Sequence, residues 1–65
     1  MEPHEQRVVD EKAALDEKIE KLRVFTGEDT FLTLHWPDRE LLKHQLRTMA
    51  YYSDILGRRI ARFAQ

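Results

Sequence analysis

The stretch LLKHQLRTMAYYSDILGRRIARF, residues 41–63, decides the fold of this chain of 65 residues. Its main apolar side chains recur at steps of four, three, seven, four and three residues, namely Leu42, Leu46, Met49, Leu56, Ile60 and Phe63. This spacing is a heptad seam along one face of a helix, and Ser53 fills the skipped position. Pro37 suits the first position of a helix, because its missing N–H needs no partner there. The pattern predicts a long helix over about residues 37–63.

A second apolar stripe lies nearer the N-terminus, where no glycine or proline interrupts the chain between Pro3 and Thr26. Its members lie at steps of seven, four and three residues, namely Val8, Leu15, Ile19 and Leu22. Lys12 occupies the gap in this stripe. Gly27 comes next, and a glycine at this position can take positive φ and end a helix. We therefore expect a first helix over about residues 3–26.

The connector, residues 27–36, is apolar, because Phe31, Leu32, Leu34 and Trp36 are crowded into six positions. Asp29 or Thr30 is a suitable cap for a single helical turn in this segment. The sequence thus predicts an all-α fold of one domain, residues 1–65, in which two antiparallel helices form a hairpin. We expect the two stripes to form the core and to be closed at the connector by Phe31, Leu34 and Trp36.

A chain this short has a thin core, which small folds supplement with disulfides, a metal or oligomerisation. The sequence has no cysteine, so disulfides and thiolate metal sites are excluded, and this fits a reducing cytosol. No apolar run approaches the ~20 residues of a membrane span. The first ten residues lack the basic start and apolar stretch of a signal peptide. We expect a protein of the cytoplasm that does not enter the membrane.

The apolar arc of the second helix is wider than one partner helix covers, because Leu41, Ala50, Tyr52 and Ile55 flank the seam. Three small residues follow one another at steps of four, Ser53, Gly57 and Ala61, and another backbone can approach the helix closely along this row. We expect self-association into a helical bundle, with this interface: Trp36, Tyr52, Ser53, Ile55, Gly57 and Ala61. The alternative is that the extra apolar surface only packs against Phe31, Leu34 and Trp36.

Charge divides the chain into an acidic and a basic half. Residues 1–35 hold nine acidic and five basic side chains, a net of −4, whereas residues 36–65 hold three acidic and six basic ones, a net of +3. The two halves should attract each other. Candidate ligand-binding residues lie in the basic half, namely Arg47, Tyr51, Arg58 and Arg59. They suit a phosphate-bearing ligand, or they only complement the helix dipole and the acidic half. Duplex DNA is not expected at a net charge of −1.

Catalytic constellations are not found in the sequence. Ser53 has no histidine within helical reach to act as its base. The carboxylates of Asp16, Glu17 and Glu20 lie on a face rich in lysine, which is ordinary solvation. Glu40 and His44 share a face but offer a divalent ion two ligands without a third. We expect no catalytic residue, no metal and no cofactor, so the protein is predicted to act by binding.

The chain resembles a group of short helical-hairpin proteins of tailed phages and prophages over about residues 6–63. The resemblance is carried by the run Glu11-Lys-Ala-Ala-Leu-Asp-Glu-Lys-Ile-Glu-Lys-Leu22, by the break at Gly27, and by these residues: Leu42, Gln45, Leu46, Met49, Tyr52, Ser53, Ile55, Leu56, Gly57, Arg59 and Ile60. More distantly, the hairpin is similar to the hairpin domain of phage proteins that sequester cyclic-nucleotide immune signals. The resemblance implies an oligomer that traps its ligand between protomers, with no contact residue carried over.

Two functions from different classes follow. The first is a counter-defence sponge, a homo-oligomer in the host cytoplasm that sequesters a cyclic or other nucleotide. The second is an inhibitor or adaptor that docks on a host or viral protein through Trp36, Tyr52 and Ile55. A purely structural virion or assembly component is a third hypothesis.

Overall fold

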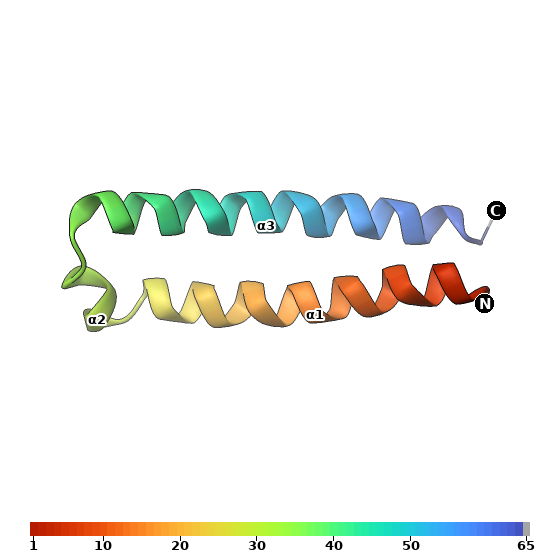
Figure 1. The fold of residues 1–65 in the computed structure, drawn as a ribbon, viewed down its shortest axis with the longest axis horizontal. Coiled ribbons are helices and arrows are strands. Elements are labelled where there is room, and N and C mark those ends of the chain that lie inside the picture. Colours follow the sequence, from red (N-terminus) through yellow and green to blue (C-terminus); the bar gives the residue numbers. More distant parts are fainter. Residues whose placement is uncertain (65) are drawn as a thin grey trace.

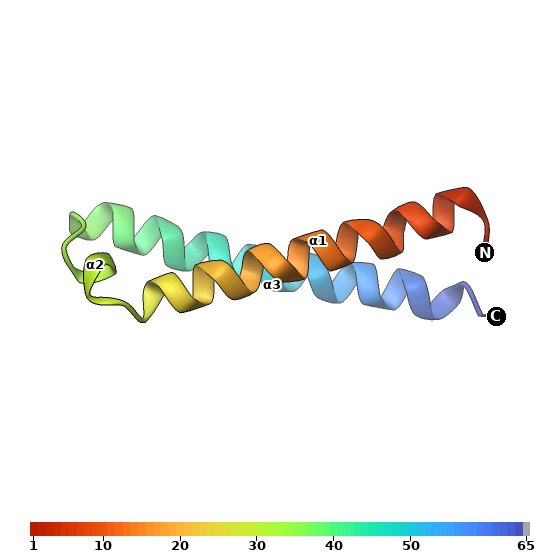
Figure 2. The same ribbon diagram turned by 90° about the horizontal axis from the view of Figure 1, so that it is seen from below.

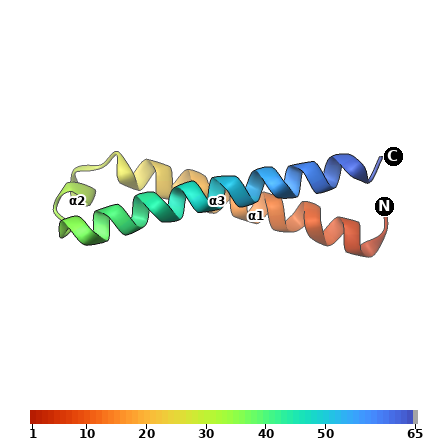
Figure 3. The same ribbon diagram turned by 90° about the horizontal axis from the view of Figure 1, so that it is seen from above.

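The computed structural model describes residues 1–64 and contains three helices, α1 (Pro3–Thr26), α2 (Asp29–Leu32) and α3 (Trp36–Arg62). Figure 1 shows α1 and α3 side by side and antiparallel, with α2 in the connector and both ends of the chain at the opposite end of the rod. The molecule measures 47 × 14 × 14 Å. The two long helices cross at a shallow angle (Figures 2 and 3). The predicted all-α hairpin is confirmed.

Local hydrogen bonds fix the ends of α1. The Glu5 carboxylate accepts from the backbone N–H of Glu2 at 2.9 Å, which satisfies a donor that the first turn leaves free. At the other end, Gly27 has φ of −93°, and its N–H donates to the carbonyl of Val24 at 3.1 Å. Helix α1 thus ends at Thr26, as predicted, but the chain leaves it through a right-handed turn and not through the positive φ that a glycine can take.

The connector forms the expected short helix, but its cap differs. Glu28 is the N-cap of α2 in an extended conformation and makes no side-chain capping bond, so neither Asp29 nor Thr30 has the predicted role. Thr30 instead offers its carbonyl to the Thr33 hydroxyl at 2.6 Å, which closes the turn. This turn carries Phe31 into the space between the long helices.

The core is thin, as a hairpin of this size requires. Four apolar side chains of the described residues are buried: Val8, Ile19, Phe31 and Leu56. The other members of the two stripes are only half-buried: Leu15, Leu22, Leu42, Leu46, Met49, Ile60 and Phe63. Leu56 is the most enclosed of all, at 0% exposure. The stripes thus face each other, but they retain an accessible edge along the hairpin.

Trp36 does not close the core, contrary to the prediction, because it is 62% exposed. Helix α3 begins at Trp36 and not at Pro37, so the tryptophan already follows the helical periodicity. That periodicity puts it on the face of Lys43, seven residues later, and away from the stripe that begins at Leu42. Phe31 and the half-buried Leu34 close the connector end without it.

A polar layer interrupts the apolar seam. The Lys12 ammonium donates to the Asp16 carboxylate at 2.8 Å and to the Ser53 hydroxyl at 2.9 Å, and Ser53 in turn donates to Asp16. Beside this layer, the Tyr52 hydroxyl donates to Glu11. The Lys12 and Ser53 hydrogen bonds lower the pKa of Asp16, and the bond to Glu11 raises the pKa of Tyr52. The pair Lys12–Asp16 therefore links the helices through Ser53, although Asp16 itself is exposed, as expected.

The charge split does not produce ion pairs between the helices. Within the described residues, each Lys or Arg that lies within 4.0 Å of a carboxylate finds it on its own helix, three or four residues away. Among the described residues, the hydroxyl groups of Ser53 and Tyr52 connect the acidic and basic halves: Ser53 accepts from Lys12 and donates to Asp16, and Tyr52 donates to Glu11.

Candidate functional site

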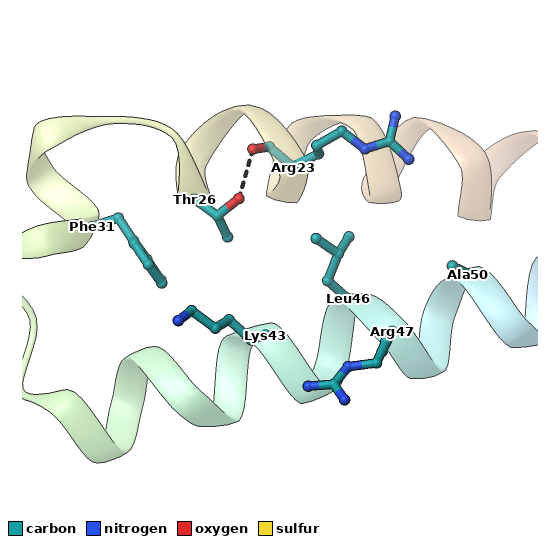
Figure 4. A pocket seen from close by; sticks show the side chains of 7 residues that line it. All are labelled: Arg23, Thr26, Phe31, Lys43, Leu46, Arg47 and Ala50. Atoms are coloured by element: carbon teal, nitrogen blue, oxygen red, sulfur yellow. Dashed lines mark hydrogen bonds between the residues drawn. The ribbon is translucent and has the colours of Figure 1, made fainter.

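An open cleft of about 500 Å³ lies between the C-terminal end of α1, α2 and α3. Its lining combines basic, polar and apolar side chains: Arg23, Thr26, Phe31, Lys43, Leu46, Arg47 and Ala50. Figure 4 shows Phe31 entering from α2 and Leu46 pointing from α3 toward α1. The cleft exists because the half-buried Leu46 and the small Ala50 leave part of the seam unfilled.

Three cations from two helices surround the cleft, and they differ in how their charges are balanced. Arg23 pairs with Glu20 at 2.9 Å, and its side chain runs back along α1 (Figure 4). Lys43 pairs with Glu40 at 3.2 Å. Arg47 is exposed and has no carboxylate within 4.0 Å among the described residues. Arg47 is therefore the cation of the cleft with the most capacity for an anionic ligand.

The floor of the cleft is apolar and closely packed. The Phe31 ring is 3% exposed and packs edge-on against Phe25, with ring centroids 5.9 Å apart and an angle of 83° between the rings. Thr26 adds a hydroxyl, which donates to the Arg23 carbonyl at 2.7 Å. An apolar floor with basic residues at the rim suits a ligand that has a flat apolar part and a negative charge.

The structure does not bring the four predicted ligand-binding residues into one pocket. Arg47 lines the cleft, and Tyr51, one turn later, is 69% exposed on the outer side of α3. Arg58 lies beyond the cleft and pairs with Asp54 at 3.0 Å. Arg59 belongs to a different side of the helix, near Tyr52. Of the predicted set, only Arg47 belongs to the cleft of the single chain.

The predicted interface residues divide into two groups. Trp36, Tyr52, Ile55 and Ala61 are exposed, whereas Ser53 is 8% exposed and bonds to α1. A Cβ atom added to Gly57 would lie 3.3 Å from Cε of Lys12. Ser53 and Gly57 therefore give close approach to α1 of the same chain. Their predicted role at an interface with another chain stays a prediction.

Of the residues that line the cleft, the sequence analysis names only Arg47 as a candidate ligand contact; it misses the other six, Arg23, Thr26, Phe31, Lys43, Leu46 and Ala50. Lys43 precedes Arg47 by one turn, so the pair was visible in the sequence as i, i+4 neighbours. Arg23 and Thr26 lie on another helix, and their place depends on the register of the hairpin. No local signal marks them.

Within residues 1–64, no three His, Asp or Glu side chains gather closely enough to bind a metal ion. None of the described helices combines the length and the apolar character that crossing a bilayer requires.

The comparisons with known proteins agree with a binding role. Neither the curated proteins nor the solved structures contain a significant match to this chain. A family model described as Sequestin matches residues 2–62, which include α1, α2 and α3 entirely. The family name is consistent with binding or sequestering. Because the match covers nearly the whole hairpin, the chain belongs to the Sequestin family.

Proposed function

We propose that the protein sequesters a small anionic ligand, a nucleotide, in the cleft between α1, α2 and α3. The observation that carries the proposal is the combination of Arg23, Lys43 and Arg47 around a floor that contains the Phe31 ring. Arginine and lysine at the rim hold phosphate oxygens, and the apolar floor contacts the base. The protein releases its ligand unchanged, so it acts by lowering the free concentration.

The resemblance to phage and prophage hairpins supports a biological setting for this role. A bacterial host that signals with a nucleotide is disarmed when the nucleotide is bound. We therefore place the protein in the host cytoplasm as a counter-defence sponge, with cyclic and linear nucleotides as the ligand classes to be tested.

Calorimetry against mono-, di- and cyclic nucleotides tests the proposal. Arg47→Ala should weaken binding by about 1.5–3 kcal/mol, because it removes a charge-assisted contact. Arg7→Ala is the matched control, since Arg7 is exposed near the opposite end of α1 and should leave binding unchanged. If no nucleotide binds at millimolar concentration, the protein is not a nucleotide sponge.

Self-association is the second part of the proposal. The seam keeps an accessible edge, and a further stripe at steps of seven, four and three residues follows one side of α3: Leu41, Thr48, Tyr52 and Ile55. Leu41 is 65% exposed, and Tyr52 and Ile55 are also open. A second copy packed on this stripe would enlarge a core that is thin in the single hairpin. Tyr51, Arg58 and Arg59 are then candidates for contacts across the assembly.

Light scattering at tens of micromolar tests this assembly. Ile55→Glu should convert the oligomer into a monomer, because it puts a charge into the apolar stripe. Leu32→Glu is the control, since Leu32 is exposed on α2 and lies outside the stripe. A wild-type protein that is already monomeric would remove the idea.

A protein-binding inhibitor or adaptor is the second candidate function. It is favoured by the exposure of Trp36, Tyr52 and Ile55, three large side chains that can anchor a partner. Affinity capture with a host extract should then recover a defined protein, and Trp36→Ala should abolish that capture without changing the helical content. Capture that is equal for both forms would remove Trp36 from the interface.

A further inference from the structure

A continuous row of side chains follows one side of α3 outside the hairpin core. Its members recur at alternating steps of four and three residues, and we call them the outer stripe: Leu41, Gln45, Thr48, Tyr52, Ile55 and Arg59. All six are exposed in the single chain. Steps of four and three residues are the spacing with which two helices pack along a shared seam. The outer stripe thus has the pattern of a second helix–helix seam, which the described residues of the single hairpin leave uncovered.

The polar groups of the outer stripe tolerate being covered, because two of its hydroxyl groups already have partners within the hairpin. The Thr48 hydroxyl donates to the His44 carbonyl at 3.0 Å, and the Tyr52 hydroxyl donates to Glu11 of α1. Covering these residues therefore leaves neither hydroxyl without a hydrogen bond, which is the usual cost of burying such a group. The contact with Glu11 also restrains the Tyr52 ring, so less side-chain freedom is lost when a partner packs on it.

The charges at the two ends of α3 identify the occupant of the outer stripe as a second copy in antiparallel orientation. The last turn of α3 is basic, with Arg59 and Arg62, whereas the first turn carries the acidic Asp38. In a parallel pair of α3 helices, Arg59 would face the partner's Arg59, and like charges in contact are destabilising. In an antiparallel pair, the basic end of one α3 lies along the acidic end of the other. The outer stripe is therefore complementary to itself in one direction only.

The cleft lies on the other side of α3. Four residues of this helix line it: Lys43, Leu46, Arg47 and Ala50. With 3.6 residues per turn, the mean direction of these four differs from that of the outer stripe by about 170° around the helix axis. A second copy that packs on the outer stripe therefore leaves the cleft open.

We propose that two copies of this chain pack α3 against α3 in antiparallel orientation along the outer stripe, and that each copy keeps its own open cleft. This inference rests on the self-association in the proposed function, and it adds the face, the direction and the register. In that register Thr48 faces the partner's Tyr52, so the twofold axis passes between these positions and every member of the outer stripe meets another member. The assembly then offers two independent clefts.

Pulsed electron paramagnetic resonance of the spin-labelled His35→Cys variant tests the orientation, since the chain has no cysteine of its own. His35 is exposed and lies outside the outer stripe. It is about 15 residues from the twofold axis, so the two labels of an antiparallel pair should lie about 45 Å apart. A parallel pair would put them within about 25 Å, because packed helices lie side by side. Adding Ile55→Glu to the labelled chain should abolish the measured distance.

Thiol labelling with a maleimide tests whether the clefts stay open, at a concentration where light scattering shows the oligomer. Thr48→Cys should react at least about tenfold more slowly than the same variant carrying Ile55→Glu, because the partner shields it. Arg47→Cys should react at the same rate, within about twofold, in both backgrounds. Slower labelling of Arg47→Cys in the oligomer would mean that the partner covers the cleft, and it would overturn the arrangement.

The outcomes separate this inference from the self-association on which it rests. A stable dimer with a short distance between the His35→Cys labels would overturn the antiparallel packing alone. A chain that is monomeric by light scattering and shows no distance between labels would refute the proposed self-association as well.

Discussion

The Lys12 ammonium lies 2.9 Å from the Ser53 hydroxyl and joins α1 to α3 across 41 residues of chain. Lys12 interrupts the apolar stripe of α1, and Ser53 interrupts that of α3. The two interruptions face each other, so the polar positions of the stripes coincide in the folded hairpin. Any shifted pairing of the helices would put the Lys12 ammonium against apolar side chains, which is costly. The polar layer thus helps to specify the register.

Ser53→Ala tests the contribution of this layer to stability. We expect a loss of about 0.5–1.5 kcal/mol in the free energy of unfolding, because hydrogen bonds to Lys12 and Asp16 are removed from a buried site. Chemical denaturation measures the change. Thr33→Val is the control, since the Thr33 hydroxyl bonds only to the Thr30 carbonyl of its own exposed turn. Equal losses in the two variants would argue against a special role for the layer.

Asp16 should make the stability depend on acid pH. Its pKa is lowered in the folded state by hydrogen bonds from Lys12 and Ser53, so its contribution is present above its ordinary pKa near 3.8. The contribution is lost as the pH falls through the lower, folded-state pKa. Asp16→Asn should therefore flatten the acid side of the stability profile measured by thermal unfolding. Asp10→Asn, on the outer side of α1, should leave the loss of stability at acid pH as steep as in the wild-type protein.

Tyr52 should make the stability of the fold depend on alkaline pH. Its pKa is raised above 10.0 by the hydrogen bond to Glu11, so its contribution is complete below that value and is lost as the pH rises through the folded-state pKa. In Tyr52→Phe, stability should be lower at neutral pH and should decline less between pH of about 10 and 12. Tyr51→Phe is the control. An unchanged alkaline limb in Tyr52→Phe would contradict the Glu11 contact.

Leu56 and Leu46 should differ strongly in their cost of truncation. Leu56→Ala leaves a cavity at the most enclosed side chain and should cost about 2–5 kcal/mol. Leu46→Ala should cost less, because Leu46 is half-buried and already borders the cleft. Urea denaturation of both variants measures the difference. A larger loss at Leu46 would mean that an assembly, and not the single hairpin, encloses that part of the seam.

Much of the fold could be predicted from periodicity. The stripes through Ile19 and Leu56 and the apolar turn at Phe31 are local patterns. In a short chain, the two stripes can be buried only by packing the two helices against each other. Trp36 was misplaced because it was assigned to the connector, whereas it is the first residue of α3 and follows the periodicity of that helix away from the apolar stripe. Gly27 marks the end of α1 as predicted without taking positive φ, because glycine permits that conformation without requiring it.

The cleft was harder to predict, since its walls come from three elements. Arg47 was found because its charge and its neighbour Tyr51 lie on one helix face. Arg23 joins it only through the hairpin register, which depends on contacts such as that between Lys12 and Ser53. Periodicity predicts that the face of Ser53 and Gly57 is in close contact, but it does not report which chain covers that face, and the contact with Lys12 comes from the folded hairpin.

The most direct test of ligand binding in the cleft is a nuclear magnetic resonance titration of the isotope-labelled protein with the nucleotide panel. We predict that a nucleotide shifts the signals of Thr26, Phe31, Lys43 and Arg47, which line the cleft, and leaves those of Arg7 unchanged. Saturation of these shifts would give the affinity and the site together. The absence of any shift at millimolar nucleotide, or shifts confined to residues outside the cleft, would contradict the account.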